Sequence, residues 1–224
     1  VGANDEDVET VDMAGEAKVR GAVLQSPITG PSNYRASGHF DAWLKARGII
    51  ALTGVDTRAL TALIREKGMP NAVIAHDPSG VFDLAALKAR ARAVPDIDGQ
   101  DLVPAVASTQ RYGWDETDWR WNEGYGHQGA PKYNVVAIDY GVKRNILRLL
   151  ADRACKVTVV PPTMPAADIL ALKPDGIFLA NGPGDPAATG EYSVPTIKAL
   201  VDSGTPTFGI CLRHQMLALQ LGAR

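Results

Sequence analysis

Cysteine and histidine are scarce in this sequence, and it lacks long apolar runs and any excess of basic residues. The 224 residues include two cysteines and four histidines, and the formal net charge is −2. Two cysteines do not form a disulfide framework, and the scattered histidines show no metal-ligand spacing. No apolar run is long enough to span a bilayer. We therefore expect a protein of the reducing cytoplasm that binds no metal, no membrane and no nucleic acid.

Phosphate-binding motifs are also absent. The sequence contains neither G-x-x-x-x-G-K-[ST] nor G-x-G-x-x-G, so we expect no nucleotide cofactor on this chain itself. The composition is that of a globular protein, with 46% apolar and 21% charged residues. The length allows one large domain or two ordinary ones.

The second part of the chain, residues 132–224, alternates regularly between short apolar runs and helical patterns. Repeated strand–helix units of this kind predict a parallel sheet covered by helices on both faces. The expected strands are 135–139, 156–160, 177–180 and 207–210, and the expected helices are 143–152, 166–172, 193–202 and 212–221.

The first part, residues 1–127, is interpreted as a separate α/β domain of structural or partner-binding character. Its helix at 58–67 has Asp56 or Thr57 as a cap, and Leu60, Leu63 and Ile64 are predicted to form one buried face. The segment 108–131 is rich in tryptophan, tyrosine and glycine and is interpreted as the connection between the domains, although a docking surface is an alternative. The other expected elements are strands at 18–24, 49–52 and 71–75 and helices at 40–47 and 82–92.

Cys211 stands between an apolar run expected to be a buried strand, 207–210, and a helical pattern. A cysteine at such a turn resembles a nucleophile elbow, which raises one side chain above the sheet and points a helix N-terminus at it. The helix dipole and free N–H groups favour the thiolate, which is the nucleophilic form. The alternative is a small buried residue in an ordinary β–α turn. Cys155, which opens the expected strand 156–160, is interpreted as a small core residue.

A glycine- and proline-rich turn, Asn181-Gly-Pro-Gly-Asp-Pro186, follows the expected strand 177–180. Its glycines leave backbone N–H groups unshielded, so the turn could donate hydrogen bonds to a developing negative charge. The alternative is a tight surface turn. In a parallel sheet this turn, Cys211 and Asp139-Tyr-Gly141 would all lie at the carboxyl edge, where ligands bind.

These motifs resemble a known family. Asn181-Gly-Pro-Gly-Asp-Pro186 together with Gly209-Ile-Cys-Leu-x-His-Gln215 is similar to the class I glutamine amidotransferase domain, which has a flavodoxin-like fold. Asp139-Tyr-Gly-Val-Lys-Arg-Asn-Ile-Leu-Arg148 and the stretch 56–68 resemble the small, glutaminase subunit of carbamoyl-phosphate synthetase. The resemblance covers essentially the whole chain and implies a fragment that lacks part of the N-terminal domain and the latter half of the amidotransferase domain.

The resemblance implies hydrolysis of glutamine at Cys211, with ammonia passed to a large synthetase subunit that holds ATP and Mg²⁺ and serves arginine and pyrimidine biosynthesis. Gly182 and Leu212 would supply the oxyanion N–H groups, and Gly184 and Gln215 would contact the glutamine. The family's histidine base and its glutamate partner would lie beyond Arg224, and His214 is not expected to replace that base. The chain alone is therefore expected to have no useful glutaminase activity.

One residue departs from the family pattern. Arg213 stands where the family has glycine, two residues after the nucleophile. If that position needs a left-handed backbone, arginine would strain the elbow by about 1–2 kcal/mol. Arg213 and the absent base favour a second hypothesis, a catalytically impaired or non-catalytic subunit that organises a synthetase. A cysteine hydrolase of the α/β-hydrolase type is a third, but that class lacks the Asn-Gly-Pro-Gly-Asp-Pro turn.

Overall fold

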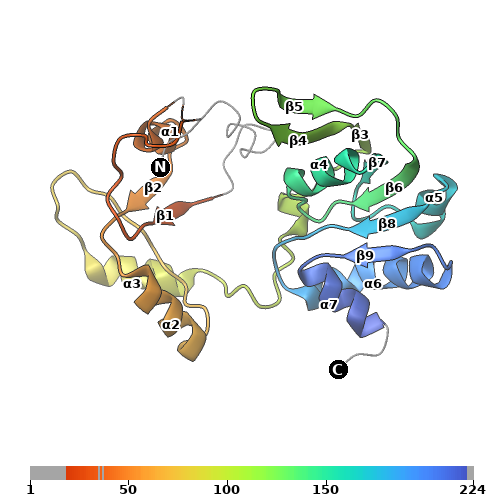
Figure 1. The fold of residues 1–224 in the computed structure, drawn as a ribbon. Helices are drawn as coiled ribbons and strands as arrows, with labels where there is room; N and C mark the ends of the chain where they lie inside the picture. The colour runs from red at the N-terminus through yellow and green to blue at the C-terminus, as the bar shows by residue number, and fades with distance from the viewer. Residues whose placement is uncertain (1–18, 35, 37, 221–224) are drawn as a thin grey trace. The chain divides into compact units, whose positions relative to one another are not determined.

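The computed structural model describes residues 19–34, 36 and 38–220, and the chain divides into two compact units, 1–96 and 97–224. The first unit contains a two-stranded parallel sheet and three helices (Figure 1). These elements are β1 (Gly21–Val23), α1 (Phe40–Ala46), β2 (Ile50–Leu52), α2 (Thr57–Lys67) and α3 (Leu84–Ala93). The predicted strand start at Lys18 lies outside the described residues.

Side-chain caps set the starts of the helices in the first unit. Asp56 Oδ1 accepts a hydrogen bond from Ala59 N at 2.8 Å, which confirms Asp56 as the cap of α2. The predicted buried face of that helix is wrong, because no residue of α2 is buried and Leu63 is 42% exposed. The described two-stranded sheet offers too little apolar surface to cover these helices. Residues 71–75, predicted as a strand, form no strand in the structure.

The second unit is built on a five-stranded sheet in the order β3-β7-β6-β8-β9. Strands β6 to β9 are parallel, and β3 is antiparallel to β7, so the predicted α/β fold with a parallel sheet is confirmed. The strands are β3 (Tyr112–Trp114), β6 (Tyr133–Ile138), β7 (Cys155–Val160), β8 (Gly176–Leu179) and β9 (Thr207–Gly209). The helices are α4 (Arg144–Asp152), α5 (Ala166–Ala171), α6 (Pro186–Asp202) and α7 (Leu212–Gln220).

Each face of this sheet has its own apolar core. On one face Ile138, Leu179 and neighbouring residues pack with Ile169 of α5, Ile197 of α6 and Met216 of α7. On the other face Ala137, Val159 and Phe178 pack with Leu147 of α4. Helices therefore cover both faces, as the strand–helix alternation predicted (Figure 1).

The segment 97–131 belongs to the second unit. Tyr112–Trp114 joins the sheet as β3, and β4 (Glu116–Arg120) forms a hairpin with β5 (Gly124–His127) that packs on α4. The predicted domains were 1–127 and 132–224, with 108–131 as the connection, whereas the compact units divide between Asp96 and Ile97. The pairing of β3 with β7 explains the difference, because it ties this segment to the sheet.

Two further details differ from the predictions. Helix α6 begins at Pro186, seven residues before the predicted start at 193, since Asp185 caps it and Pro186 occupies its first turn. Phe208 in β9 was expected to be buried but is 64% exposed, although its ring stacks on Phe178 at 6.3 Å between centroids. The predicted helix end at Leu221 lies outside the described residues.

Within the part of the chain that the structure describes, none of the helices combines the length and apolar character needed to cross a membrane. Over the same residues, no group of three or more histidine, cysteine, aspartate or glutamate side chains is placed to hold a metal ion.

Candidate active site

Three strand ends meet at the carboxyl edge of the sheet. Asp139 N donates to Val160 O, Ala180 N donates to Ile138 O, and Ile210 N donates to Leu179 O. The turns after β6, β8 and β9 are therefore neighbours, and adjacent strands lie roughly 4.8 Å apart. The chain continues from β6 to β7 on one side and to β8 and β9 on the other. The crevice at such a switch point is the usual ligand site of an open α/β sheet.

Cys211 occupies the turn between β9 and α7. Its thiol is exposed, and its backbone is left-handed, with φ of +60°. Cys211 O accepts hydrogen bonds from His214 N at 3.0 Å and Gln215 N at 3.4 Å, so Cys211 precedes the first helical residue directly. A left-handed non-glycine residue costs on the order of 1–3 kcal/mol and persists only where its surroundings impose it. This geometry is that of a nucleophile elbow at a helix N-terminus.

The turn after β8 can only be made with glycine at two positions. A Cβ atom on Gly182 would stand 2.3 Å from Tyr140 O, so this backbone lies directly against the turn after β6. Gly184 has φ of +88°, and a Cβ there would meet Gln100 O at 2.8 Å. The glycines thus serve close backbone approach as well as exposure of N–H groups.

Side chains join the turns to one another. Asp139, which is 4% exposed, accepts hydrogen bonds from Gly141 N and Val142 N through Oδ1 and from Ser108 N through Oδ2, each at 2.8 Å. Asn181 Nδ2 donates to Gly141 O at 3.1 Å, and Asn181 Oδ1 accepts from Lys143 N at 3.1 Å. The sequence analysis placed Asp139 at this edge but missed both side-chain roles.

The segment before the sheet supports the turn after β8 from the other side. Asp185 N donates to Gln100 O at 3.0 Å, and Asp185 Oδ2 accepts from Gly99 N at 2.7 Å. The hydrogen bonds from Ala187 N and Gly99 N lower the pKa of the Asp185 carboxyl below its usual value. Nothing in the sequence pattern indicated this contact, because residues 99 and 185 lie far apart in the chain.

The remaining predicted site residues lie on α7. Leu212 is the first residue of this helix, and Gln215 is exposed in its first turn. His214 is also exposed there, one turn along the same helix from Cys211. Residue 213 belongs to α7, so the left-handed residue is Cys211 and not Arg213. The side chains of Leu212 and Arg213 lie outside the described residues.

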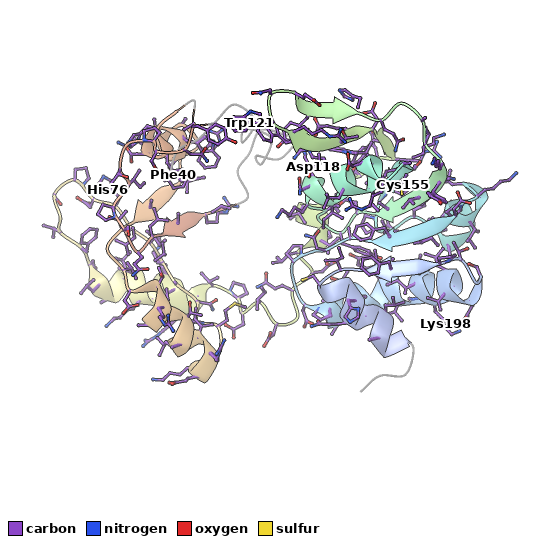
Figure 2. The ribbon with its side chains drawn as sticks, viewed as in Figure 1. Phe40, His76, Asp118, Trp121, Cys155 and Lys198 are labelled. Atoms are coloured by element: carbon purple, nitrogen blue, oxygen red, sulfur yellow. The ribbon has the colours of Figure 1, made fainter. Side chains whose placement is uncertain are left out.

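Other polar features lie away from this edge. A hollow of about 350 Å³ is lined by residues of the β4–β5 hairpin and the end of α4, among them Arg120, Glu123 and Asp152. Cys155 opens β7 at the opposite, amino edge, where burial raises the pKa of its thiol (Figure 2). Burial, with the charge of Asp139, also raises the pKa of Tyr112 to about 12.

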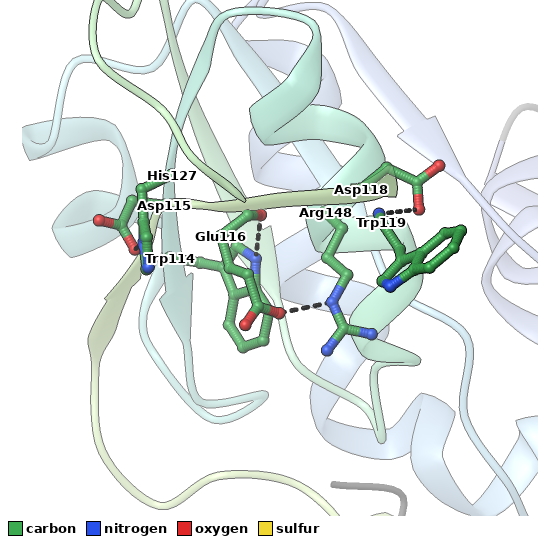
Figure 3. A network of polar contacts seen from close by, with 7 residues as sticks. All are labelled: Trp114, Asp115, Glu116, Asp118, Trp119, His127 and Arg148. Atoms are coloured by element: carbon green, nitrogen blue, oxygen red, sulfur yellow. Dashed lines mark hydrogen bonds and ion pairs between the residues drawn. The ribbon is translucent and has the colours of Figure 1, made fainter. Parts of the chain in front are cut away.

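A partly buried ion pair joins α4 to the β4–β5 hairpin. Arg148 Nε lies 2.5 Å from Glu116 Oε1 (Figure 3). The guanidinium also stands 3.9 Å from the centroid of the Tyr125 ring. Trp114 Nε1 donates to Glu116 O at 2.9 Å. These contacts hold the hairpin on the helix and involve none of the turns at the carboxyl edge, so we regard the network as structural.

Two family models match the chain. Residues 136–224 match the family of glutamine amidotransferase class-I, and residues 1–74 match the CPSase domain of the carbamoyl-phosphate synthase small chain. The first match contains all of the strand ends described above, from β6 to the Cys211 turn.

Curated relatives are similar over the whole chain. The carbamoyl phosphate synthase small chain of Bradyrhizobium diazoefficiens is 66% identical over 224 residues, which is 100% of this chain and 57% of that relative. The small chain of Rhizobium meliloti is 62% identical over 226 residues, covering 100% of this chain and 56% of that relative. The chain thus spans a little over half the length of these proteins.

Proposed function

Because the chain belongs to the family of carbamoyl-phosphate synthase small chains, we propose that it carries the nucleophile half of a glutamine-hydrolysing site. The substrate is glutamine, and the ammonia goes to a large synthetase subunit that binds ATP and Mg²⁺. The observation that carries this proposal is the position of Cys211, which is left-handed at the N-terminus of α7. Its turn follows β9, and β9 pairs with β8, the strand that the Asn181–Gly182 turn follows.

The chemistry follows from this arrangement. The Cys211 thiolate attacks the side-chain amide carbon of glutamine, and the carbonyl oxygen becomes an oxyanion. Gly182 N–H and Leu212 N–H donate to this oxyanion. The carbon–nitrogen bond then breaks, and the leaving nitrogen takes up the proton that the thiol gave up. Ammonia departs, and a glutamyl thioester remains on Cys211. Attack by water releases glutamate and restores the thiol.

Each part of the geometry supports one of these roles. The α7 N-terminus favours the thiolate, since helix N–H groups and the dipole stabilise negative charge. The close packing of Gly182 on Tyr140 O holds the first oxyanion donor in place without a side chain. Removal of one such donor in other enzymes typically costs about 10²–10³-fold in kcat.

Cys211→Ser tests the proposal in a protein of the relatives' full length, assayed with its large subunit. We expect glutamine-dependent carbamoyl phosphate synthesis to fall by at least about 10³-fold, because an unactivated serine is a far weaker nucleophile. Synthesis from added ammonia should stay within twofold of the parent. Glutaminase turnover that survives the change would show that Cys211 is not the nucleophile.

A further inference from the structure

The turn after β6 is held at three points by one buried side chain. Asp139 accepts from Gly141 N and Val142 N within the turn and from Ser108 N outside it, each at 2.8 Å. A carboxyl group that is 4% exposed and holds three backbone donors leaves the turn little freedom to move. The turn at residues 139–142 is therefore rigid.

Asn181 connects this turn to the end of β8, the neighbouring strand. Its Nδ2 donates to Gly141 O, and its Oδ1 accepts from Lys143 N, both at 3.1 Å. The two contacts use the donor end and the acceptor end of the amide, so they determine how the side chain is oriented. An aspartate of the same shape could keep the contact with Lys143 N, but its ionised form has no donor for Gly141 O.

Gly182 rests directly on the turn that these side chains hold. A Cβ at Gly182 would stand 2.3 Å from Tyr140 O and 2.9 Å from Tyr140 Cβ, and Tyr140 lies between Asp139 and Gly141. The backbone of Gly182 therefore follows any shift of the turn. Because Asn181 is covalently joined to Gly182, it acts on the same peptide group from the other side.

We propose that Asp139 and Asn181 are positioning residues that hold Gly182 N–H in the oxyanion position. The inference rests on the proposed hydrolysis of glutamine at Cys211 and adds the residues that align one donor. Neither side chain is assigned contact with the substrate. They act through the backbone, and their effect should therefore appear on the rate of the chemical step more than on the binding of glutamine.

The test is Asn181→Asp in the full-length protein with its large subunit, compared with Asn134→Asp. Asn134 also makes two side-chain hydrogen bonds to backbone, at the amino edge of the sheet. Both come from Nδ2, to Leu172 O at 2.7 Å and to Lys173 O at 2.9 Å. We expect Asn181→Asp to lower kcat for glutamine hydrolysis by about 10–100-fold with KM within about threefold. Asn134→Asp should leave kcat within about twofold.

Two further measurements separate this proposal from its premise. The rate of Cys211 alkylation by iodoacetamide should match the parent in Asn181→Asp, because the nucleophile is untouched. Asp139→Asn should show the same loss of kcat at unchanged KM; if that variant does not fold, Asn181→Asp decides alone. Equal kcat losses in the Asn181 and Asn134 variants, or a change in KM alone, would overturn the positioning role. Survival of activity in Cys211→Ser would instead refute the proposed function.

Discussion

Left-handed non-glycine residues occur at both the amino and the carboxyl edge of the five-stranded sheet, but they serve different purposes there. At the amino edge, Ala154 and Lys173 have φ of +60° and +52°, and each stands just past the end of a helix. A left-handed residue there is a common way to end a helix. At the carboxyl edge, Cys211 is left-handed immediately before a helix, where the cap position is normally extended. Helix capping explains the first two residues and not the third.

The asparagines show the same contrast. Asn134 ties the amino edge to Leu172 and Lys173, beyond α5, and no proposed reaction takes place there. Asn181 ties the turn after β8, which contains Gly182, to the turn after β6. Asparagine side chains thus stabilise the fold at the amino edge and, in the proposed mechanism, align a backbone donor at the carboxyl edge. Backbone strain or a side-chain hydrogen bond therefore indicates function only where helix capping or stabilisation of the fold does not already explain it.

The largest difference in kcat should appear when one methyl group is added at the carboxyl edge and, as a control, one at the amino edge. Gly182→Ala would place a Cβ 2.3 Å from Tyr140 O, so the turn must shift, and we expect kcat to fall about 100-fold with stability lower by about 1–3 kcal/mol. Gly176→Ala is the matched control, since its nearest contact would be Pro206 O at 3.7 Å. Steady-state kinetics and denaturant unfolding of both variants measure the difference.

The control should stay within about twofold of the parent in kcat and within about 1 kcal/mol in stability. Similar kinetic losses in the two alanine variants would show that the edges are equally sensitive, which contradicts the assignment of catalysis to the carboxyl edge.

A second substitution should lower the free energy of unfolding without lowering kcat for glutamine. Arg148→Met leaves the Glu116 carboxyl, which is 22% exposed, without its partner on α4, and we expect the free energy of unfolding to fall by about 2–4 kcal/mol. Glutamine kcat of the folded enzyme should change less than about threefold, because the described contacts of this pair are with the β4–β5 hairpin and Trp114 of β3 and not with the turns at the carboxyl edge. Adding Glu116→Leu should recover part of the stability. A kcat loss as large as that of Gly182→Ala would show that α4 packing also sets the site.

The smallest expected effect is a gain in stability from a substitution at the amino edge. Lys173→Gly relieves a left-handed lysine at a helix end, and we expect stability to rise by up to about 1 kcal/mol with kcat unchanged. Thermal unfolding and glutamine kinetics measure both quantities. A loss of stability would mean that the lysine side chain makes a contact worth more than the backbone strain.

The sequence predicted the elements of the sheet unit well where strands were apolar and β-branched. The strands β6 to β9 lie within one or two residues of their predicted bounds, because such runs favour buried parallel strands. Prediction of helices and strands failed where the local amino-acid composition is typical of a turn or a connection. The start of α6 was missed because Pro186 was assigned to the preceding turn and Gly190 disfavours a helix, and β3 was missed within an aromatic segment that was interpreted as a connection.

The candidate site was predicted as far as local motifs allow. The elbow at Cys211 and the glycine turn follow from residues adjacent in sequence. The contacts of Asp139 with Ser108 and of Asp185 with Gly99 span 31 and 86 residues, and no local pattern encodes them. The amphipathic pattern of α2 was read correctly as a helix, but its apolar face is not buried among the described residues.

The central claim is that Cys211 forms a covalent bond to substrate, and trapping the intermediate tests it most directly. The full-length protein with its large subunit would be mixed with glutamine, quenched in acid during turnover and digested for peptide mass spectrometry. We predict a glutamyl thioester on the peptide that contains Cys211 and none on the peptide that contains Cys155, whose raised pKa and place at the amino edge remove it from the reaction. Steady hydrolysis of glutamine with no adduct on Cys211, or with the adduct on Cys155, would contradict the account.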